Sequence, residues 1–364
     1  MTVWDDLAAA VSAARADGDE LLAAARADAE LLRVQLVAET ATLDATRATL
    51  GEVRALHEQT RGELAAALAR IVVLEEQLAA LQPPVVRRLG WYNGGPAADV
   101  SFALGGTPQI ASTYYQPDQA GLNLEAEIAR IKRGTSPLIT LTLKSGPATL
   151  ADVATQTPAA IALLDTYTNA LQQLAEVDPG VPVYATLDHE AEVKINQGTL
   201  PGVTATVYAK ALSVFLDRCT TRAPAVRSVY WYGASDRTKI AQVLAGLTTP
   251  PDVICMDPYS TRSHPGTETF TETIKPHLDW LRSNPDYTRL GSPPVGLGEF
   301  GTDIAHGDPS CAAWLTDLRA RLVDLDLLFA LLFNRDSTGW RYKITSGGTP
   351  ASVTAFNRSI TQTP

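Results

Sequence analysis

The sequence predicts a (β/α)8 TIM barrel preceded by a long N-terminal α-helical coiled coil. Three observations support this fold class. The first 82 residues contain no proline, are rich in alanine and repeat apolar residues at heptad spacing. Beyond them, eight short apolar segments alternate with amphipathic stretches. Polar and aromatic residues follow most of these segments, where a barrel gathers its functional groups.

Length and charge limit the classes of function. The 364 residues can hold a barrel of roughly 250 residues and a further element. The net charge of −10 argues against nucleic acid as a ligand, because phosphate binding needs a basic surface. The charge is uneven: residues 1–82 carry a net −7 and the rest a net −3. This asymmetry favours two modules.

Three cysteines, Cys219, Cys255 and Cys311, are widely spaced, so we expect buried free thiols rather than a disulfide framework or a zinc site. No apolar run reaches the roughly 18 residues of a membrane span. The first residues lack the basic and apolar regions of a signal peptide. We therefore expect no membrane partner, and release from the cell by another route, such as host lysis after assembly into a virus particle.

Residues 1–82 form the predicted stalk. One heptad register runs from Ala8 to Leu81, and its last segment places Ile71, Leu74, Leu78 and Leu81 in a and d positions. Polar residues interrupt the seam earlier, including His57, which we interpret as a register-setting residue. One helix cannot bury such a stripe alone, so we expect a homo-oligomer. A trimer is our preference, although the seam itself does not distinguish three strands from two.

Pro83 and Pro84 end the predicted helix. We divide the chain into a stalk for oligomerisation and virion attachment over residues 1–82, a Pro-rich linker and start of the first strand over 83–88, and a barrel over 89–364. The eight predicted strands are Val86–Trp91, Gln109–Tyr114, Leu138–Leu143, Val183–Leu187, Val226–Trp231, Val253–Met256, Val295–Glu299 and Leu327–Phe333. The predicted helices are Asn123–Lys132, Ala151–Val177, Val203–Cys219, Asp236–Leu247, Phe270–Arg282, Cys311–Leu325 and Ala351–Thr361.

Nucleotide and metal sites find little support in the sequence. Gly296, Gly298 and Gly301 match a GxGxxG pattern, but they lie inside a predicted strand and no helix follows, so we interpret the match as chance. A metal-dependent hydrolase would have to use Asp188, His189, Asp257, Asp303 or His306, without any HxH or HExxH spacing. We predict no cofactor and no metal.

Two carboxylates at strand ends are the most informative candidates. Glu190 follows the fourth predicted strand and Glu299 ends the seventh. In a barrel these ends meet at one rim, and two facing carboxylates suit glycosidic hydrolysis. We predict Glu190 and Glu299 as catalytic residues, supported by Asp188, His189, Glu192, Asp257 and Tyr259.

Aromatic and amide residues lie at the same predicted rim. Sugar rings stack their C–H faces on aromatic side chains, and their hydroxyls bond to carboxylates and amides. We predict substrate contacts from Trp91, Tyr92, Asn93, Tyr114, Trp231, Tyr232, Asn334 and Trp340.

Five short blocks resemble clan A glycoside hydrolases, above all family 26, and the barrels of minor tail proteins in phages of actinobacteria. They are Gly90–Gly94, Tyr184–Glu192, Asp252–Tyr259, Pro294–Thr302 and Leu332–Arg341. The resemblance implies that Glu190 is the acid/base and Glu299 the nucleophile. It also implies that Tyr259 bonds to the nucleophile and that Trp340 lies under the adjacent sugar. Asp188 and Glu192 depart from the mannanase pattern, so mannan is not the expected substrate.

These patterns lead to an expectation for function and to open alternatives. We expect a phage tail protein, carried in the virion at the tail tip or fibre, whose barrel binds and hydrolyses host cell-surface polysaccharide by a retaining mechanism. Its partners would be that glycan, other tail proteins and copies of itself. Glu299 would be ionised, with the pKa of Glu190 raised by the charges of Glu299, Asp188 and Glu192. An inactive glycan-binding barrel, a purely structural barrel and a metal enzyme remain alternatives.

Overall fold

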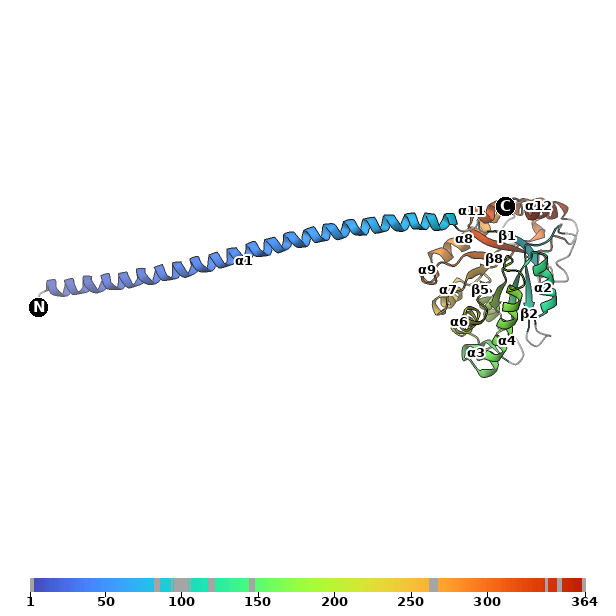
Figure 1. Ribbon diagram of the computed structural model, residues 1–364, viewed down its shortest axis with the longest axis horizontal. Helices are drawn as coiled ribbons and strands as arrows, with labels where there is room; N and C mark the ends of the chain where they lie inside the picture. The colour runs from blue at the N-terminus through green and yellow to red at the C-terminus, as the bar shows by residue number, and fades with distance from the viewer. Residues whose placement is uncertain are drawn as a thin grey trace. The chain divides into compact units, whose positions relative to one another are not determined.

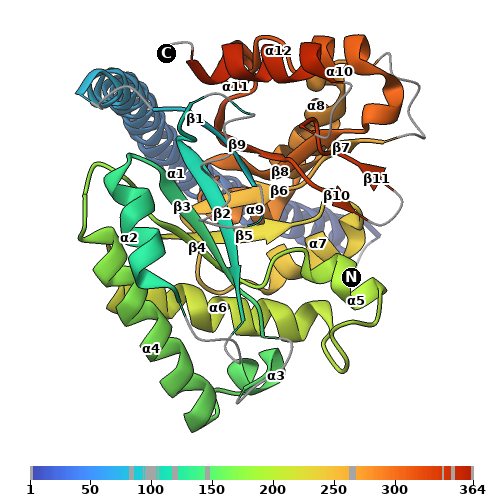
Figure 2. The ribbon, with the colours of Figure 1, turned by 90° about the vertical axis from the view of Figure 1, so that its right-hand side faces the viewer.

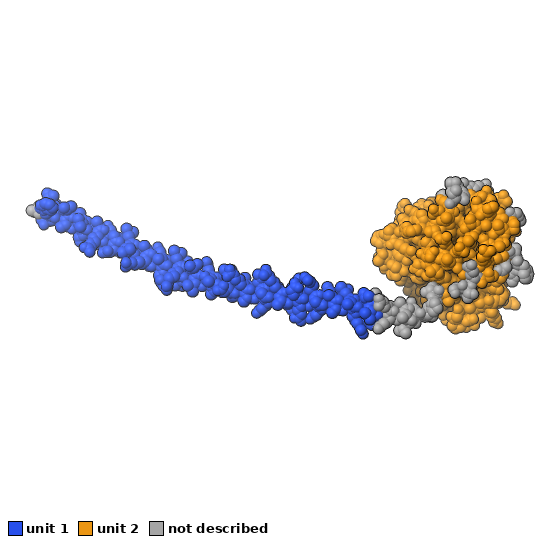
Figure 3. Space-filling model, turned by 90° about the horizontal axis from the view of Figure 1, so that it is seen from above, with its two compact units in different colours: residues 1–84 blue, residues 85–364 orange. Residues whose placement is uncertain are grey.

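The chain forms two compact units, residues 1–84 and 85–364 (Figure 3). The structure, a computed structural model, describes residues 3–81, 86–92, 94, 104, 106–116, 122–143, 148–261, 268–337, 340–345 and 349–361, without the side chains of 75–81, 337 and 340.

The first unit is one helix, α1 (Val3–Leu81), of 79 residues (Figure 1). The predicted stalk helix is thus confirmed. Asp5 and Asp6 lie in its first turn, where negative side chains interact favourably with the helix dipole. Large apolar side chains along the helix are exposed, among them Leu64 at 59% and Ile71 at 49%. Its association into a coiled coil stays a prediction.

The second unit is a nearly closed parallel barrel, as the alternating pattern predicts. Its eight main strands pair in parallel along one path that runs from β1 to β2. Figure 2 shows these strands surrounded by helices. In spatial order the strands are β1 (Arg88–Tyr92), β9 (Leu327–Phe333), β8 (Val295–Thr302), β6 (Val253–Met256), β5 (Arg227–Tyr232), β4 (Tyr184–Leu187), β3 (Ser136–Leu141) and β2 (Ile110–Tyr115).

The barrel closes between β1 and β2. The Gln109 N–H donates to the Leu89 carbonyl over 3.1 Å, and the Leu89 N–H donates to the Gln109 side chain over 3.2 Å. The two backbones approach so closely that a Cβ on Gly90 would come within 1.7 Å of the Ile110 oxygen. Glycine at this position is therefore a condition of closure.

Two predicted helices are each divided in two. Residues 151–177 hold α3 (Leu150–Ala154) and α4 (Pro158–Ala175), because Gln156 takes a left-handed conformation and Thr157 with Pro158 starts a new helix. Residues 311–325 divide at Asp317, which is also left-handed.

The remaining elements are α2 (Leu124–Lys132), α5 (Ala191–Asn196), α6 (Ala205–Arg222), α7 (Arg237–Gly246), α8 (Phe270–Ser283), α9 (Pro285–Arg289), a 3₁₀ turn (Ile304–His306), α10 (Asp308–Trp314), α11 (Leu318–Asp324), α12 (Pro350–Thr361), and the short strands β7 (Tyr259–Ser260), β10 (Asp336–Ser337) and β11 (Trp340–Arg341).

Two apolar cores hold the barrel together. One lies between the strands and the helices, and the other fills the barrel interior. Cys219, Cys255 and Cys311 are free and buried, which confirms the prediction for the cysteines. None of the helices that the structure describes combines the length and apolarity needed to cross a bilayer. The interior core consists of Ile110, Leu138, Tyr184, Val229, Trp231, Val253, Cys255, Phe329 and Leu331.

Candidate active site

Three carboxyl groups meet at the C-terminal ends of the strands. Glu190 follows β4, Asp257 follows β6, and Glu299 lies within β8. Asp257 and Glu299 are buried, whereas the side chain of Glu190 keeps 26% of its surface exposed. The charge of Glu190 raises the pKa of Asp257 and the pKa of Glu299. The structure thus brings the two predicted catalytic residues to one site.

Glu299 is held at both carboxylate oxygens. The Tyr114 hydroxyl donates to Oε1, and the Tyr259 hydroxyl donates to Oε2. The contact from Tyr259 is the one that the family resemblance implies. Tyr114 was predicted as a substrate contact, and its bond to Glu299 was not foreseen. Two hydroxyl donors fix the orientation of this carboxylate and favour its ionised form.

Asp257 links Glu299 to the barrel interior. Its Oδ1 accepts the backbone N–H of Glu299 over 2.7 Å and the indole N–H of Trp231 over 2.5 Å. Trp231 is fully buried, and it fits beside β8 because Gly298 has no side chain: a Cβ there would lie 2.2 Å from the indole. Trp231 is therefore a positioning residue, not the predicted substrate contact.

A β-bulge turns Glu299 toward the site. Leu297 of β8 pairs with Ala330 of β9, and Phe300 pairs with Leu332, so three steps on β8 match two on β9. The extra residue changes the alternation of side chains along the strand. As a result Phe300 packs outward against Phe270 and Trp314, while Glu299 faces the tyrosine hydroxyls.

A strained turn presents Glu190. Asp188 has a φ of 53° and Glu190 a φ of 51°, and both lie in the left-handed region. Such backbone conformations cost about 1–3 kcal/mol each and gather at functional sites. The Glu190 N–H donates to the Trp231 carbonyl over 3.1 Å, which fixes the turn to β5. His189 Nε2 lies 4.0 Å from Glu190 Oε2, consistent with a positioning role.

A buried ion pair lies behind this turn. Lys194 Nζ contacts the Asp188 carboxylate, and the same nitrogen lies 3.4 Å from His189 Nδ1. Asp188 is fully buried and Lys194 is 7% exposed. Lys194 was not among the predicted site residues, because α5 was not among the predicted helices. A helix beginning at Ala191 would have placed Lys194 one turn above Glu190.

Glu192 is also buried, at 2% exposure, and its Oε1 accepts the Gly233 N–H over 2.5 Å. Burial raises the pKa of Glu192 to about 7. For Glu190, burial is again the main cause of a raised pKa, Lys194 and Asp257 lower it, and Asp188 raises it. Asp188 thus raises the pKa of Glu190 as expected, and loss of hydration is a larger cause that the sequence analysis did not include.

The three central carboxyls cannot all be ionised at neutral pH. Burial first, and then the charge of Glu190, raise the pKa of Glu299 to about 8, against the lowering effect of Tyr114 and Tyr259. Burial and both glutamates raise the pKa of Asp257 well above its usual range. The site therefore holds at least one proton near neutrality, as an acid/base and nucleophile pair requires.

The aromatic residues divide between the rim and the interior. Tyr92 and Tyr114 lie in edge contact, with ring centroids 4.8 Å apart, beside Glu299. The prediction that Trp91 and Tyr232 contact substrate is wrong, because each is at most 1% exposed and faces the helical shell. Trp91 packs on Phe356 of α12, and Tyr232 packs on Tyr230.

The remaining predicted contacts are of two kinds. Asn334 is fully buried and donates to Thr345 over 3.1 Å, so it supports the loop after β9 rather than facing a ligand. Asn93 and the side chain of Trp340 lie outside the described residues.

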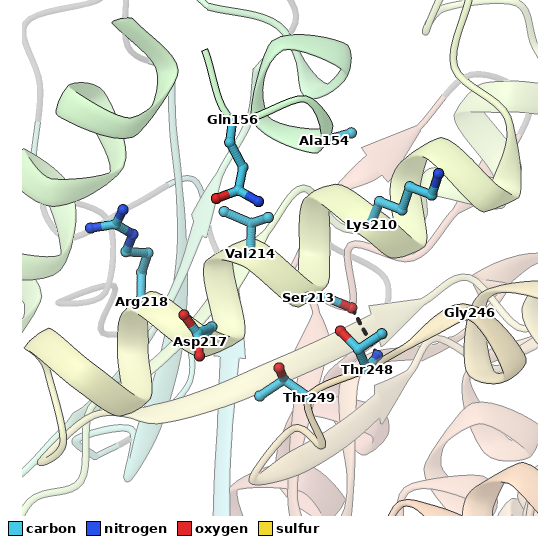
Figure 4. A pocket seen from close by; sticks show the side chains of 10 residues that line it. All are labelled: Ala154, Gln156, Lys210, Ser213, Val214, Asp217, Arg218, Gly246, Thr248 and Thr249. Carbon is cyan, nitrogen blue, oxygen red and sulfur yellow. Dashed lines mark hydrogen bonds between the residues drawn. The ribbon is translucent and has the colours of Figure 1, made fainter. Parts of the chain in front are cut away.

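Within the described residues, no three His, Cys, Asp or Glu side chains gather in a way that could hold a metal ion. A cavity of about 410 Å³ lies elsewhere, among α3, α6 and the end of α7 (Figure 4). Its lining includes Lys210, Asp217 and Thr249, and none of the three carboxyls of the site. Gly296 and Gly298 lie inside β8 against Phe329 and Trp231, which agrees with the interpretation that the GxGxxG match is chance.

No protein-family model matches the sequence, and no curated protein is similar to it. Solved structures do resemble the fold. A GH26 β-mannanase from Bacteroides ovatus is 17% identical over 76% of this chain and 88% of its own, with a TM-score of 0.50. The structure of XacCel5A is 14% identical over 75% of this chain and 99% of its own, also with a TM-score of 0.50. The barrel therefore has the fold of clan A glycoside hydrolases, and identities this low establish the fold alone.

Proposed function

We propose that the barrel is a retaining glycoside hydrolase with Glu299 as nucleophile and Glu190 as acid/base. The observation that carries the proposal is the fixing of Glu299 by Tyr114 and Tyr259 in the same site as Glu190. The fold, shared with a β-mannanase, supports it.

The reaction follows from the two carboxyl groups. The Glu299 carboxylate attacks the anomeric carbon, while Glu190 gives its proton to the departing glycosidic oxygen, so the C–O bond breaks as the glycosyl ester forms. Glu190, now ionised, takes a proton from water. That water attacks the anomeric carbon and releases Glu299 with retained configuration. The partial exposure of Glu190 gives water and the leaving group access to this carboxyl.

Asp257 and the tyrosines prepare the site for this reaction. Asp257 holds the backbone of Glu299 through a hydrogen bond of 2.7 Å, and it lowers the pKa of Glu190. It couples the protonation of the two catalytic groups, because the charge on each glutamate raises the pKa of Asp257. The tyrosine hydroxyls stabilise the ionised nucleophile before it attacks.

The alternative is a barrel that binds glycan without cleaving it. One observation favours it: a Glu299 with a pKa of about 8 is mostly protonated at neutral pH, and a protonated carboxyl is a poor nucleophile. In this case the carboxyls would act only as hydrogen-bonding ligands.

We also propose that the protein belongs to the tail of a phage of actinobacteria, with host envelope polysaccharide as the target. The exposed apolar residues of α1 support a homo-oligomeric stalk, for which we propose a trimer. The N-terminal end of the stalk would join further tail proteins. Immunogold labelling of phage particles with antibody against the barrel tests this placement. We expect label on the tail, and label absent from purified particles would contradict it.

Sugar release from purified actinobacterial envelopes tests the activity. The full chain is compared with Glu190→Gln, Glu299→Gln and the control Glu176→Gln, an exposed glutamate at the far end of α4. The proposal predicts release by the wild type and the control, and loss in the other two while binding persists. Binding by all four chains with no release by any would instead establish the glycan-binding alternative.

A further inference from the structure

Arg335 places a guanidinium at the rim of the proposed active site. It follows β9, at the end of the barrel where Glu190 and Glu299 lie. Its side chain is exposed, yet it is held in place: the guanidinium lies 5.7 Å above the Tyr92 ring, and Nη1 donates to the Tyr92 hydroxyl over 3.3 Å.

Two contacts connect Arg335 to the proposed nucleophile. The Tyr92 ring meets the Tyr114 ring edge-on, with centroids 4.8 Å apart, and the Tyr114 hydroxyl donates to Glu299. Arg335 is therefore two aromatic rings away from the reacting carboxylate. A polymer bound across Glu299 would pass its neighbouring units over this guanidinium.

The charge of Arg335 is not neutralised within the part of the chain that the structure describes. Its described contacts are both with Tyr92, and neither supplies a carboxylate. Arg341 and Lys343 are also exposed on the same loop, with Asp336 as the acidic residue among them. Exposed cationic residues therefore recur along the segment after β9, in a chain whose net charge is −10.

We propose that this cleft takes an anionic glycan, with Arg335 binding a carboxylate or phosphate on a sugar near the cleaved bond. The proposal rests on the glycosidase function above and adds the substrate class to it. A planar guanidinium offers parallel N–H groups that match the two oxygens of a carboxylate or phosphate.

An anionic sugar would need such a counter-charge in this site. Glu190, Asp257 and Glu299 hold at least one proton near neutrality, and the negative charge that remains on them would repel an anionic sugar without a cation nearby. A neutral sugar needs no exposed arginine at this place, and an ammonium would pair less well with two oxygens. The exposed and anchored Arg335 fits an anion better than a neutral hydroxyl.

Binding to an array of defined glycans tests the proposal. The array carries neutral oligosaccharides, the same backbones with uronic acids, and the same backbones with phosphate esters. The probe is the full chain with Glu299→Gln, which prevents turnover. It is combined with Arg335→Gln, with Arg335→Lys, or with the control Arg133→Gln, an exposed arginine after α2 at the opposite end of the barrel.

We expect the bound glycans to carry a carboxylate or a phosphate. Comparison of the glycans with uronic acids and those with phosphate esters identifies which group is bound. Arg335→Gln should weaken this binding by at least about tenfold and reduce its dependence on salt, Arg335→Lys should restore part of it, and Arg133→Gln should leave it unchanged. Preference for neutral glycans, or equal binding after Arg335→Gln, would overturn the proposal. Incubation of the bound glycans with the wild type separates the two claims: uncleaved anionic ligands would contradict the glycosidase only, and cleaved neutral ligands would contradict the anionic substrate only.

Discussion

The protonation of individual carboxyls sets the properties of this site, and burial is the first cause in each of Glu190, Glu192, Asp257 and Glu299. The hydrogen-bond donors around them act in the opposite direction. Glu299 receives two hydroxyls, and Asp257 receives two N–H groups. These donors therefore offset part of the effect of burial on the pKa of Glu299 and of Asp257.

Glu192 provides a test of this balance that does not depend on activity. Its pKa rises from an ordinary value of 4.5 to about 7 in the folded chain. The folded state thus keeps a proton that the unfolded state loses, so stability falls as the pH rises from 4.5 to 7. Glu192→Gln cannot ionise and can still accept the Gly233 N–H. We expect the variant to gain up to about 3 kcal/mol over the wild type above pH 7, and little near pH 4.5.

Urea unfolding of both chains across this pH range measures the difference. The control is Glu176→Gln, whose glutamate is exposed at the end of α4. A gap between Glu192→Gln and the wild type that does not change with pH would contradict the burial of an ionisable Glu192.

Tyr259 provides a second test, in the pH profile of catalysis. Its hydroxyl lowers the pKa of Glu299, so Tyr259→Phe should raise that pKa and move the rising limb of kcat/KM to higher pH. We expect activity near neutrality to fall about tenfold or more, the worth of one hydrogen bond to a charged group. Tyr287→Phe removes a hydroxyl that donates to the Pro293 carbonyl in the helical shell, and it should leave the limb in place. A rising limb of kcat/KM that stays at the same pH in Tyr259→Phe would show that the ionisation of Glu299 does not control this limb.

Single residues also show where sequence reasoning succeeds and fails. The alternation of side chains along a strand puts neighbours on opposite faces, so a shift of one residue reverses every assignment. Trp91 and Tyr92 illustrate this, because both end β1 and only Tyr92 faces the site. The residue types at the strand ends predicted a site there, whereas the facing direction of each side chain depends on packing against the helices.

At the scale of elements, the segments with a clear apolar pattern were predictable and the others were not. The eight strands and α1 have clear apolar patterns. The six residues of α5 have too few turns to show periodicity, and yet α5 supplies Lys194 to the buried pair with Asp188. The bulge in β8 is equally invisible in the sequence, because it depends on the register with β9.

The closure of β1 on β2 gives a prediction at this scale. A Cβ at Gly90 would lie 1.7 Å from the Ile110 carbonyl oxygen, so Gly90→Ala has to push the two strands apart. We expect a loss of about 3 kcal/mol in unfolding free energy, at the upper end of overpacking in a core. At Gly180 the nearest atom to a Cβ is 3.2 Å away, on the Asp178 side chain, so Gly180→Ala is the matched control. Equal stability of the two variants in urea unfolding would contradict this account of closure.

At the scale of the whole molecule, we propose that the stalk determines the assembly. Ile71 and Leu74 lie in the predicted seam. Val72 lies outside the seam, and its side chain is 52% exposed, which is similar to the exposure of the other two. Ile71→Asp with Leu74→Asp should place charge inside the seam and yield monomers, whereas Val72→Asp should keep the assembly. Sedimentation equilibrium should give the mass of a trimer for the wild type. A monomeric wild type, or dissociation by Val72→Asp as well, would contradict the predicted seam.

Formation of a glycosyl ester on Glu299 is the central claim for the molecule as a whole. The most direct measurement is intact-mass and peptide mass spectrometry of the full chain after incubation with a panel of 2-deoxy-2-fluoroglycosyl fluorides, which slow the release of such an ester. We expect one glycosyl unit on Glu299 in the wild type and none in Glu299→Gln. An adduct on another residue, or no adduct from any sugar that the protein is shown to cleave, would contradict the account.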